Sequence, residues 1–187
     1  MEILLRQAAA IDTQVFLYFN GHHNAVMDLI MPAITLLGDG TAMIVLWLIY
    51  FCLADRRAGV SPQIWAAACA SSLLIGAVKA YFNRLRPAIV LPDVHVLGPL
   101  LQFRSFPSGH TGAAFAVAIV LAHHYPRYKW VFYSLAVLVG YSRMYVGAHF
   151  PVDVTVGAVL GLLTGKAVIW WSCRKKEVIT RNVLENN

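Results

Sequence analysis

Six long apolar runs occupy most of this chain, and they leave few polar residues from which a water-facing surface could be built. Hydrophobic residues make up 59% of the sequence and charged residues only 13%, whereas soluble domains average roughly 45–50% and about 25%. A soluble domain of this length has too small an interior to bury so many hydrophobic residues. We therefore expect an integral membrane protein, with residues 1–187 forming a single domain.

The lengths of the runs predict an all-α bundle. They cover residues 25–37, 41–54, 63–82, 111–125, 130–145 and 152–171. Only the third and the sixth reach the roughly 20 residues that cross a bilayer as a helix. The others can span only with their polar flanking turns, and for the first, which Pro32 interrupts, both a full span and a shorter helix stay open. The sequence thus predicts six transmembrane helices.

The first residues predict a further helix of a different kind. Its apolar residues recur three or four positions apart, as Leu4, Ala8, Ile11, Val15 and Phe19. This is the period of one helical face. An amphipathic helix lying in the membrane interface is expected, with a frayed tail as the alternative. Glu2 stands where a cleaved signal peptide would carry basic residues, which argues against such a peptide.

Basic residues mark one side of the bundle. They follow the second, fourth and sixth runs, as Arg56-Arg57, Arg127 with Lys129, and Arg174 to Lys176. With six crossings these groups share a side with the N-terminus, which the positive-inside rule makes cytoplasmic. The net charge of +6 then reflects topology and anion binding, and no nucleic-acid partner is expected. We expect the inner (cytoplasmic) membrane, with segments 38–40, 83–106 and 146–151 facing the periplasm or cell exterior.

Three polar clusters lie on that outer side, and the first pairs Lys79 with Arg86-Pro87. Seven residues are close to two helical turns, so both cations can face the same way if the helix persists. Pro87 disfavours helix at Arg86 and helps to end the segment. Cations at the end of a span can also extend to lipid headgroups. This interpretation stays open when the pair is considered by itself, without the other two clusters.

The second cluster is Pro107-Ser108-Gly109-His110, directly before the fourth run. Ser108 is a good helix N-cap, and Gly109 allows an anion to approach the backbone closely. The free amides and the dipole of a helix N-terminus attract phosphate. His110 can exchange a proton near neutral pH. Capping alone would explain the serine but not the histidine.

The third cluster is Ser142-Arg143, followed by His149 and Asp153. If a helix begins near His149, the carboxylate four residues later can hold the imidazole in one tautomer. Pro151 suits the first turn of that helix. The alternative is a purely structural His–Asp pair. Together the clusters offer cations to bind a phosphate, one histidine to attack it and another to protonate the leaving oxygen, with no need for a metal.

Three further polar residues, Arg84, His95 and Arg104, fall near these clusters. Two interpretations are equally open for them. They could shape a headgroup pocket, or they could only meet anionic lipid.

The motifs K-x₆-R-P (Lys79 to Pro87), P-S-G-H (Pro107 to His110) and S-R-x₅-H-x₃-D (Ser142 to Asp153) occur in this order. They resemble the three signature motifs of the type 2 phosphatidic acid phosphatase family. The signature spans residues 79–153, and the layout of six runs extends the similarity over most of the chain.

The resemblance implies roles for eight residues. Phosphate binding is implied for Lys79, Arg86, Ser108, Gly109 and Arg143. His149 would be the nucleophile that forms a phosphohistidine, Asp153 the carboxylate that orients it, and His110 the acid that protonates the leaving group. Neither a metal nor another cofactor is expected.

The implied activity is hydrolysis of a lipid phosphate or diphosphate at the extracytoplasmic face of the bilayer. Family members of this compact size include undecaprenyl diphosphate, phosphatidylglycerophosphate and lipid A 1-phosphate phosphatases; phosphatidic acid is a further candidate substrate. Undecaprenyl diphosphate is our first candidate, because a short chain offers little outer structure to recognise a large sugar headgroup. A lipid phosphotransferase with the same site, or a lipid-phosphate-binding protein without catalysis, are the alternatives. The sequence says nothing of the oligomeric state.

Overall fold

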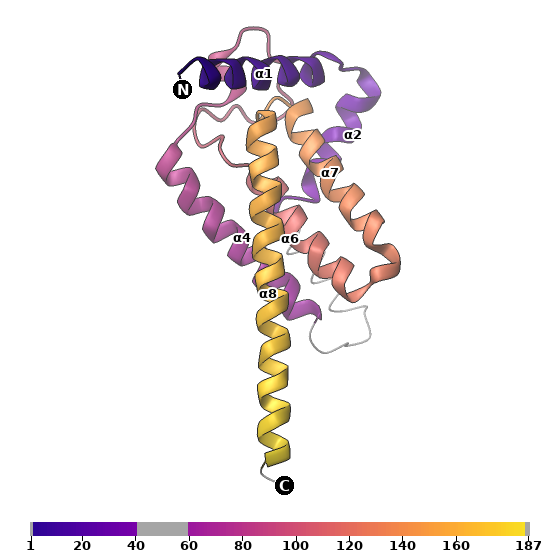
Figure 1. Ribbon diagram of the computed structural model, residues 1–187. Helices are drawn as coiled ribbons and strands as arrows, with labels where there is room; N and C mark the ends of the chain where they lie inside the picture. Colours follow the sequence, from indigo (N-terminus) through magenta and orange to yellow (C-terminus); the bar gives the residue numbers. More distant parts are fainter. Residues whose placement is uncertain (1, 41–59, 186–187) are drawn as a thin grey trace.

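The structure, a computed structural model, describes residues 2–40 and 60–185, and within these ranges every regular element is helical (Figure 1). The elements are α1 (Glu2–Gly21), α2 (Ala25–Leu36), α4 (Val60–Phe82), α5 (Pro87–Val90), α6 (Gly109–His124), the 3-10 turn η1 (Pro126–Tyr128), α7 (Lys129–Tyr145) and α8 (Pro151–Glu185). The predicted all-α class is confirmed, and five of the six apolar runs form helices. The run at 41–54 lies outside the described residues.

Helix α6 packs against α4, α7 and α8, and small residues allow the approach to α8. A Cβ atom on Gly161 would overlap the carbonyl oxygen of Gly112, and one on Gly157 would lie 2.5 Å from that of Ser108. Contacts this close require glycine, as is common where membrane helices meet. The approach brings the N-terminus of α6 beside the first turns of α8.

Helix α1 lies across one end of the bundle, at a steep angle to the long axis of α8 (Figure 1). It packs through Asp12, Phe16 and Asn20, which recur every fourth residue and are buried. The predicted apolar stripe instead points away from the protein, since Leu4 is 70% and Ile11 60% exposed. The predicted N-terminal helix is thus present, with one face on the bundle and its apolar stripe exposed, and its place in the membrane interface stays a prediction.

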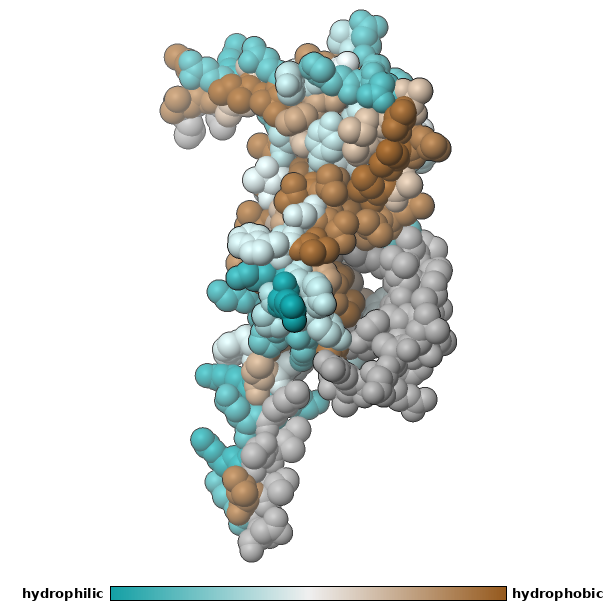
Figure 2. Space-filling model, turned by 90° about the vertical axis from the view of Figure 1, so that its right-hand side faces the viewer, coloured by the Kyte–Doolittle hydropathy of each residue, from teal (hydrophilic) through white to brown (hydrophobic). Residues whose placement is uncertain are grey.

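In the part of the chain that the structure describes, two stretches are long and apolar enough to cross a membrane. They are Pro62–Val90, which covers most of α4 and all of α5, and Pro151–Lys175 in α8. Figure 2 shows hydrophobic residues gathered on one face of the molecule beneath a more hydrophilic upper edge. Exposed apolar side chains on α2 and α7, such as Leu29 and Val137, fit this distribution. The full set of six crossings stays a prediction.

Two local predictions need correction. The helix of the third run does not persist to Arg86: it ends at Phe82, and Asn83 takes a positive φ of 40°. Arg86 is extended, as expected before a proline. Helix α8 continues to Glu185, well past the predicted end at residue 171, because its Arg, Lys and Glu residues are good helix formers and no proline follows.

The packing of α6 on α8 predicts that Gly161→Ala destabilises the bundle, because the new methyl group would meet the backbone of Gly112. The matched control is Gly76→Ala on α4, where a Cβ would meet nothing within 4 Å and helix propensity would gain about 1 kcal/mol. Thermal unfolding in detergent, followed by circular dichroism, should show a lower midpoint for Gly161→Ala alone. Equal midpoints for both variants would contradict the close approach.

Candidate active site

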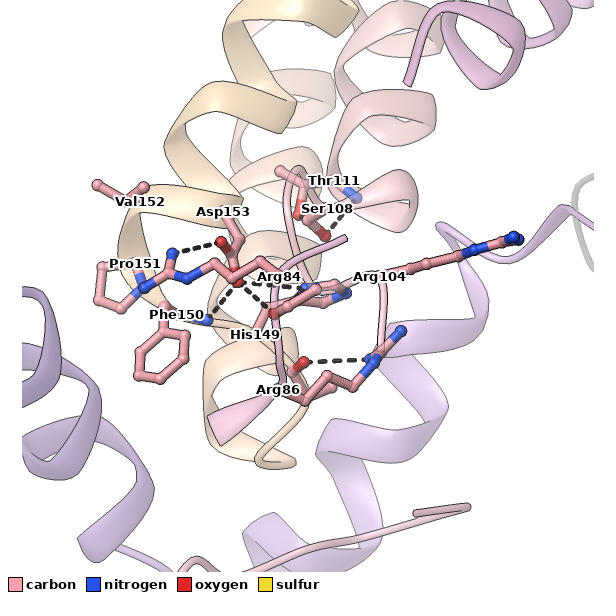
Figure 3. Close-up of polar contacts among 12 residues, drawn as sticks. Arg84, Arg86, Arg104, Ser108, Thr111, His149, Phe150, Pro151, Val152 and Asp153 are labelled. Atoms are coloured by element: carbon pink, nitrogen blue, oxygen red, sulfur yellow. Dashed lines mark hydrogen bonds and ion pairs between the residues drawn. The ribbon is translucent and has the colours of Figure 1, made fainter. Parts of the chain in front are cut away.

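The second and third clusters are joined by a backbone hydrogen bond, in which the Ser108 amide donates to the carbonyl of Asp153 at 2.8 Å. Ser108 is also the N-cap of α6, as predicted, and its Oγ accepts from the Thr111 amide at 3.4 Å. Figure 3 shows this turn beside the start of α8. The N-terminus of α6 therefore faces the turn that carries His149.

His149 and Asp153 lie together as predicted, and α8 begins at Pro151, two residues after His149, with the proline in its first turn as expected. The imidazole Nδ1 is 3.6 Å from Oδ2 of Asp153, and the two residues are 1% and 0% exposed. The His149 amide donates to the Arg143 carbonyl at 3.2 Å, which connects the turn to the end of α7. With Nδ1 towards the carboxylate, Nε2 is the nitrogen left for a substrate.

Ser105 completes this pair, and nothing in the motif spacing identifies it. Its Oγ donates to Oδ2 of Asp153 at 2.5 Å and lies 3.5 Å from Nδ1 of His149. The amide of Phe150 donates to the same carboxylate oxygen at 2.9 Å. Ser105 belongs to the long segment between α5 and α6, whose path has no periodic sequence signal. In the sequence, only its position two residues before Pro107 of the second motif connects Ser105 with the site.

Burial lowers the pKa of His149 from its ordinary value of 6.5 to about 3. The hydrogen bond with Asp153 opposes this shift, and the nearby cations Arg143, Arg86 and Lys79 reinforce it. The imidazole is therefore neutral near pH 7, which leaves a nitrogen lone pair available for attack.

Lys79 and Arg86 converge on the same region despite the early end of α4. Lys79 Nζ donates to the Arg104 carbonyl at 2.5 Å, and its Cε lies 3.9 Å from where a Cβ of Gly109 would be. Arg86 donates to the Phe103 and Ala148 carbonyls at 3.2 and 3.1 Å. Within the described residues neither cation forms an ion pair, so both keep charge to offer an anion.

A cavity of 340 Å³ opens beside these residues and is lined by Arg86, His110 and Arg143. The Arg143 Nη1 donates to Thr35 at 3.3 Å, whereas its buried Nε has no hydrogen-bond partner among the described residues. A buried donor of this kind calls for an acceptor. The remaining wall is largely apolar and comes from α2 and the segment that follows α5, including Pro32, Leu36, Leu97, Leu100 and Leu101.

His110 has a carboxylate of its own in this cavity. Its Nε2 lies 3.7 Å from Oδ2 of Asp39, just after α2. Each of the two predicted catalytic histidines, His110 and His149, therefore has an aspartate beside it. Only the pair of His149 and Asp153 could be anticipated from residue spacing.

The structure places the Arg84 side chain against two carboxylates, Asp12 at 2.9 Å and Asp153 at 2.7 Å. This arrangement was not among the interpretations that the sequence offered. Arg104 has a positive φ of 62° and binds Lys79 through its carbonyl. His95 lies elsewhere, with its ring 3.9 Å from that of His23 and its Nε2 3.5 Å from Asp28.

The helical bundle gathers cations, a capped helix N-terminus and a buried His–Asp pair at one end. This combination is that of a helical membrane phosphatase. Within that class, the model of the PAP2 superfamily matches residues 61–177. The chain belongs to this superfamily and is an enzyme of its phosphatase type.

Several characterised relatives resemble the chain. It is 32% identical over 147 residues to the undecaprenyl-diphosphatase BcrC of Bacillus subtilis, which covers 77% of this chain and 74% of that protein. It is 40% identical over 126 residues to the lipid A 1-phosphatase of Rhizobium etli, covering 61% of this chain and 52% of that one. The match thus spans about half of the Rhizobium enzyme.

Two solved structures share the fold. The Aquifex aeolicus LpxE structure superposes with a TM-score of 0.76 at 35% identity, over 83% of this chain and 93% of that one. The PAP2-type phosphatidylglycerolphosphate phosphatase of Bacillus subtilis gives a TM-score of 0.74 at 28% identity, over 90% and 87%.

The position of Ser105 predicts that Ser105→Ala slows phosphate release, because Asp153 would lose one of the two donors that hold its Oδ2. A buried hydrogen bond to a charged group contributes about 1.5–3 kcal/mol, so a decrease on the order of 10- to 100-fold in kcat is expected. Thr155→Val is the control, since that exposed hydroxyl bonds only to the Pro151 carbonyl one turn back. Unchanged kcat for Ser105→Ala would exclude this role.

Proposed function

We propose that the protein hydrolyses a lipid phosphate or diphosphate through a phosphohistidine on His149, without a metal. The observation that supports this most directly is the buried His149–Asp153 pair. It lies near Lys79, Arg86 and Arg143, none of which forms an ion pair within the described residues. A structural His–Asp pair would not need such surroundings. Burying unpaired positive charge is costly unless an anion neutralises it during function.

In the first step, Nε2 of His149 attacks phosphorus while Asp153 retains the proton on Nδ1 and stabilises the charged ring. Lys79, Arg86 and Arg143 neutralise the phosphoryl oxygens, together with the amides at the N-terminus of α6 around Ser108 and Gly109 (Figure 3). For the phosphate to enter, it would replace the backbone carbonyls that now accept from Lys79 and Arg86.

His110 would protonate the leaving oxygen as its bond to phosphorus breaks. Burial, reinforced by the cations Arg143, Arg86 and Lys79, lowers the pKa of His110 to about 4, and Asp39 opposes this shift. A phosphate bound among these cations would offset their charge and favour the protonated ring. In the second step the neutral His110 would take a proton from water, which attacks the phosphohistidine and releases phosphate. Protein cations and amides supply all the charge stabilisation in this sequence, so no metal is required.

The substrate class is suggested by the cavity and by the relatives. Cations and His110 line one part of the cavity, and apolar residues of α2 and of the segment after α5 line the rest. This division suits a phosphate headgroup that arrives from the side with its chain still in the bilayer. Among the relatives, BcrC is named for undecaprenyl diphosphate and others for lipid A or phosphatidylglycerophosphate. Undecaprenyl diphosphate remains our first candidate.

The positive-inside pattern supports six spans in the cytoplasmic membrane, with α1 in the interface and the site facing the periplasm or cell exterior. The whole chain would then form one catalytic domain. The described cation groups at Arg127 with Lys129 and at Arg174 to Lys176 lie on η1, α7 and α8, at the opposite ends from His149.

The mechanism predicts that His149→Ala abolishes phosphate release while the bundle remains folded. His149 is 1% exposed, so its truncation should lower the unfolding midpoint. The close approach of α6 and α8 is made by glycines elsewhere, so the bundle should still fold. Wild-type enzyme quenched in alkaline detergent during turnover should carry a phosphoryl group that is stable in alkali and lost in acid, and the variant should carry none. A folded His149→Ala enzyme with wild-type turnover would show that the nucleophile is wrong.

Substrate and metal independence are tested together by measuring phosphate release in detergent with EDTA. The four lipids to compare are undecaprenyl diphosphate, phosphatidylglycerophosphate, phosphatidic acid and lipid A. We expect turnover to persist in EDTA, with undecaprenyl diphosphate preferred. Activity lost in EDTA and restored by Mg²⁺ would contradict the chemistry. Labelled phosphate that appears on a second lipid instead of in water would identify a phosphotransferase.

A further inference from the structure

Arg84 lies between two buried carboxylates that come from opposite ends of the chain. Its Nη1 is 2.7 Å from Oδ1 of Asp153, and its Nη2 is 2.9 Å from Oδ2 of Asp12. Asp153 is 0% and Asp12 7% exposed. The guanidinium is planar and offers a fixed fork of donors, so it can hold both carboxylates in one geometry where a lysine would not. Figure 3 shows Arg84 reaching Asp153 from the side away from Arg86.

The second oxygen of Asp12 is also used, because Oδ1 accepts from the Val152 amide at 2.8 Å. Val152 is in the first turn of α8, where a carboxylate is favoured by the free amides and the helix dipole. Phe16, one turn after Asp12 on α1, packs on Phe150 with ring centroids 5.4 Å apart, and the Arg84 guanidinium lies 4.3 Å from the same ring. Helix α1 therefore contacts the turn that carries His149 through both polar and aromatic groups.

The contacts of Asp153 divide between its two oxygens. Oδ2 receives Ser105 and the Phe150 amide and faces His149, whereas Oδ1 receives Arg84. Rotation of the carboxylate about its bond to Cβ would break contacts on both sides. Arg84 thus fixes which oxygen faces the imidazole.

Asp12 also sets the net charge of the group around Asp153. Arg84 alone would neutralise Asp153 and weaken the attraction between this carboxylate and the His149 ring when the ring becomes positive. Asp12 restores a net charge of −1 to the group of two carboxylates and one guanidinium. In a buried setting a charge change of this kind has large effects on a neighbouring ion.

From these contacts we infer that Arg84 and Asp12 are positioning residues for Asp153, and that they make α1 a working part of the active site. The inference rests on the proposed role of His149 as nucleophile. It assigns function to Asp12, which lies outside the three signature motifs, and to Arg84, which occupies an unspecified position within the first motif. It also distinguishes α1 from a simple anchor, because the face that holds the network is not the apolar stripe that would contact lipid.

The test is steady-state kinetics of four variants, Arg84→Gln, Arg84→Lys, Asp12→Asn and the double variant Asp12→Asn/Arg84→Gln. A lost charge-assisted bond predicts that Arg84→Gln lowers kcat on the order of 10- to 100-fold, with KM changed by less than about threefold. Arg84→Lys should recover part of kcat. Asp12→Asn should lower kcat less than Arg84→Gln, and the double variant should be no slower than Arg84→Gln, since Asp12 acts through Arg84.

The matched control is the exposed pair on the same helix, Glu2 and Arg6, whose side chains are each 79% exposed. Glu2→Gln and Arg6→Gln should leave kcat and KM unchanged. His149→Ala, assayed in parallel, separates the two proposals. If His149→Ala keeps its activity, the proposed function itself is wrong.

If His149→Ala is inactive while Arg84→Gln and Asp12→Asn turn over like the wild type, only the positioning role is wrong. An increase in KM without a loss in kcat would instead make Arg84 a lipid-binding residue and overturn the inference. Because Arg84→Gln could weaken folding, the rate of phosphohistidine formation is measured in a single turnover on protein that elutes as a single peak. Asp12→Asn keeps an acceptor for the Val152 amide and so provides a second, milder variant.

Discussion

The carboxylate of Asp153 is fully buried, and much of the end of the bundle that carries the site is organised around this one charge. A buried anion is tolerated only when hydrogen bonds and counter-charges replace the water it has lost. Here the replacements are a hydroxyl from Ser105, an amide from Phe150 and the guanidinium of Arg84. They come from the segment after α5, from the turn before α8 and from the end of α4. The need to satisfy one carboxylate thus holds three separate parts of the chain in place.

A second constraint is the distance between α6 and α8. Their glycines let the backbones approach closely, and the amide of Ser108 can then bond to the carbonyl of Asp153 itself. The helix N-terminus that attracts phosphate and the residue that orients the histidine are therefore linked through main-chain atoms. A side chain larger than hydrogen at Gly157 would push Ser108 away, so packing deep in the bundle sets the geometry of the site.

Much of the site could be predicted from residue spacing because it lies at helix ends. Ser108 caps α6 and Pro151 begins α8, and a four-residue separation placed Asp153 beside His149. Ser105, Arg84 and Asp39 could not be assigned in this way. Their roles depend on the paths of irregular segments, where side-chain direction follows no period. The buried face of α1 was missed for a related reason, since its polar residues resemble solvent-facing ones until their partners are known.

The order in which the chain is made gives the network of Asp12, Arg84 and Asp153 a further consequence. Asp12 and Arg84 emerge from the ribosome first, and Asp153 follows them by many residues, at the start of the last helix. Until α8 is in place, the guanidinium has only one carboxylate to bind and His149 has no carboxylate beside it. If His149 acts as proposed, the site is complete only once α8 has packed against α6, so activity would have to wait for this helix however early the rest of the site is made.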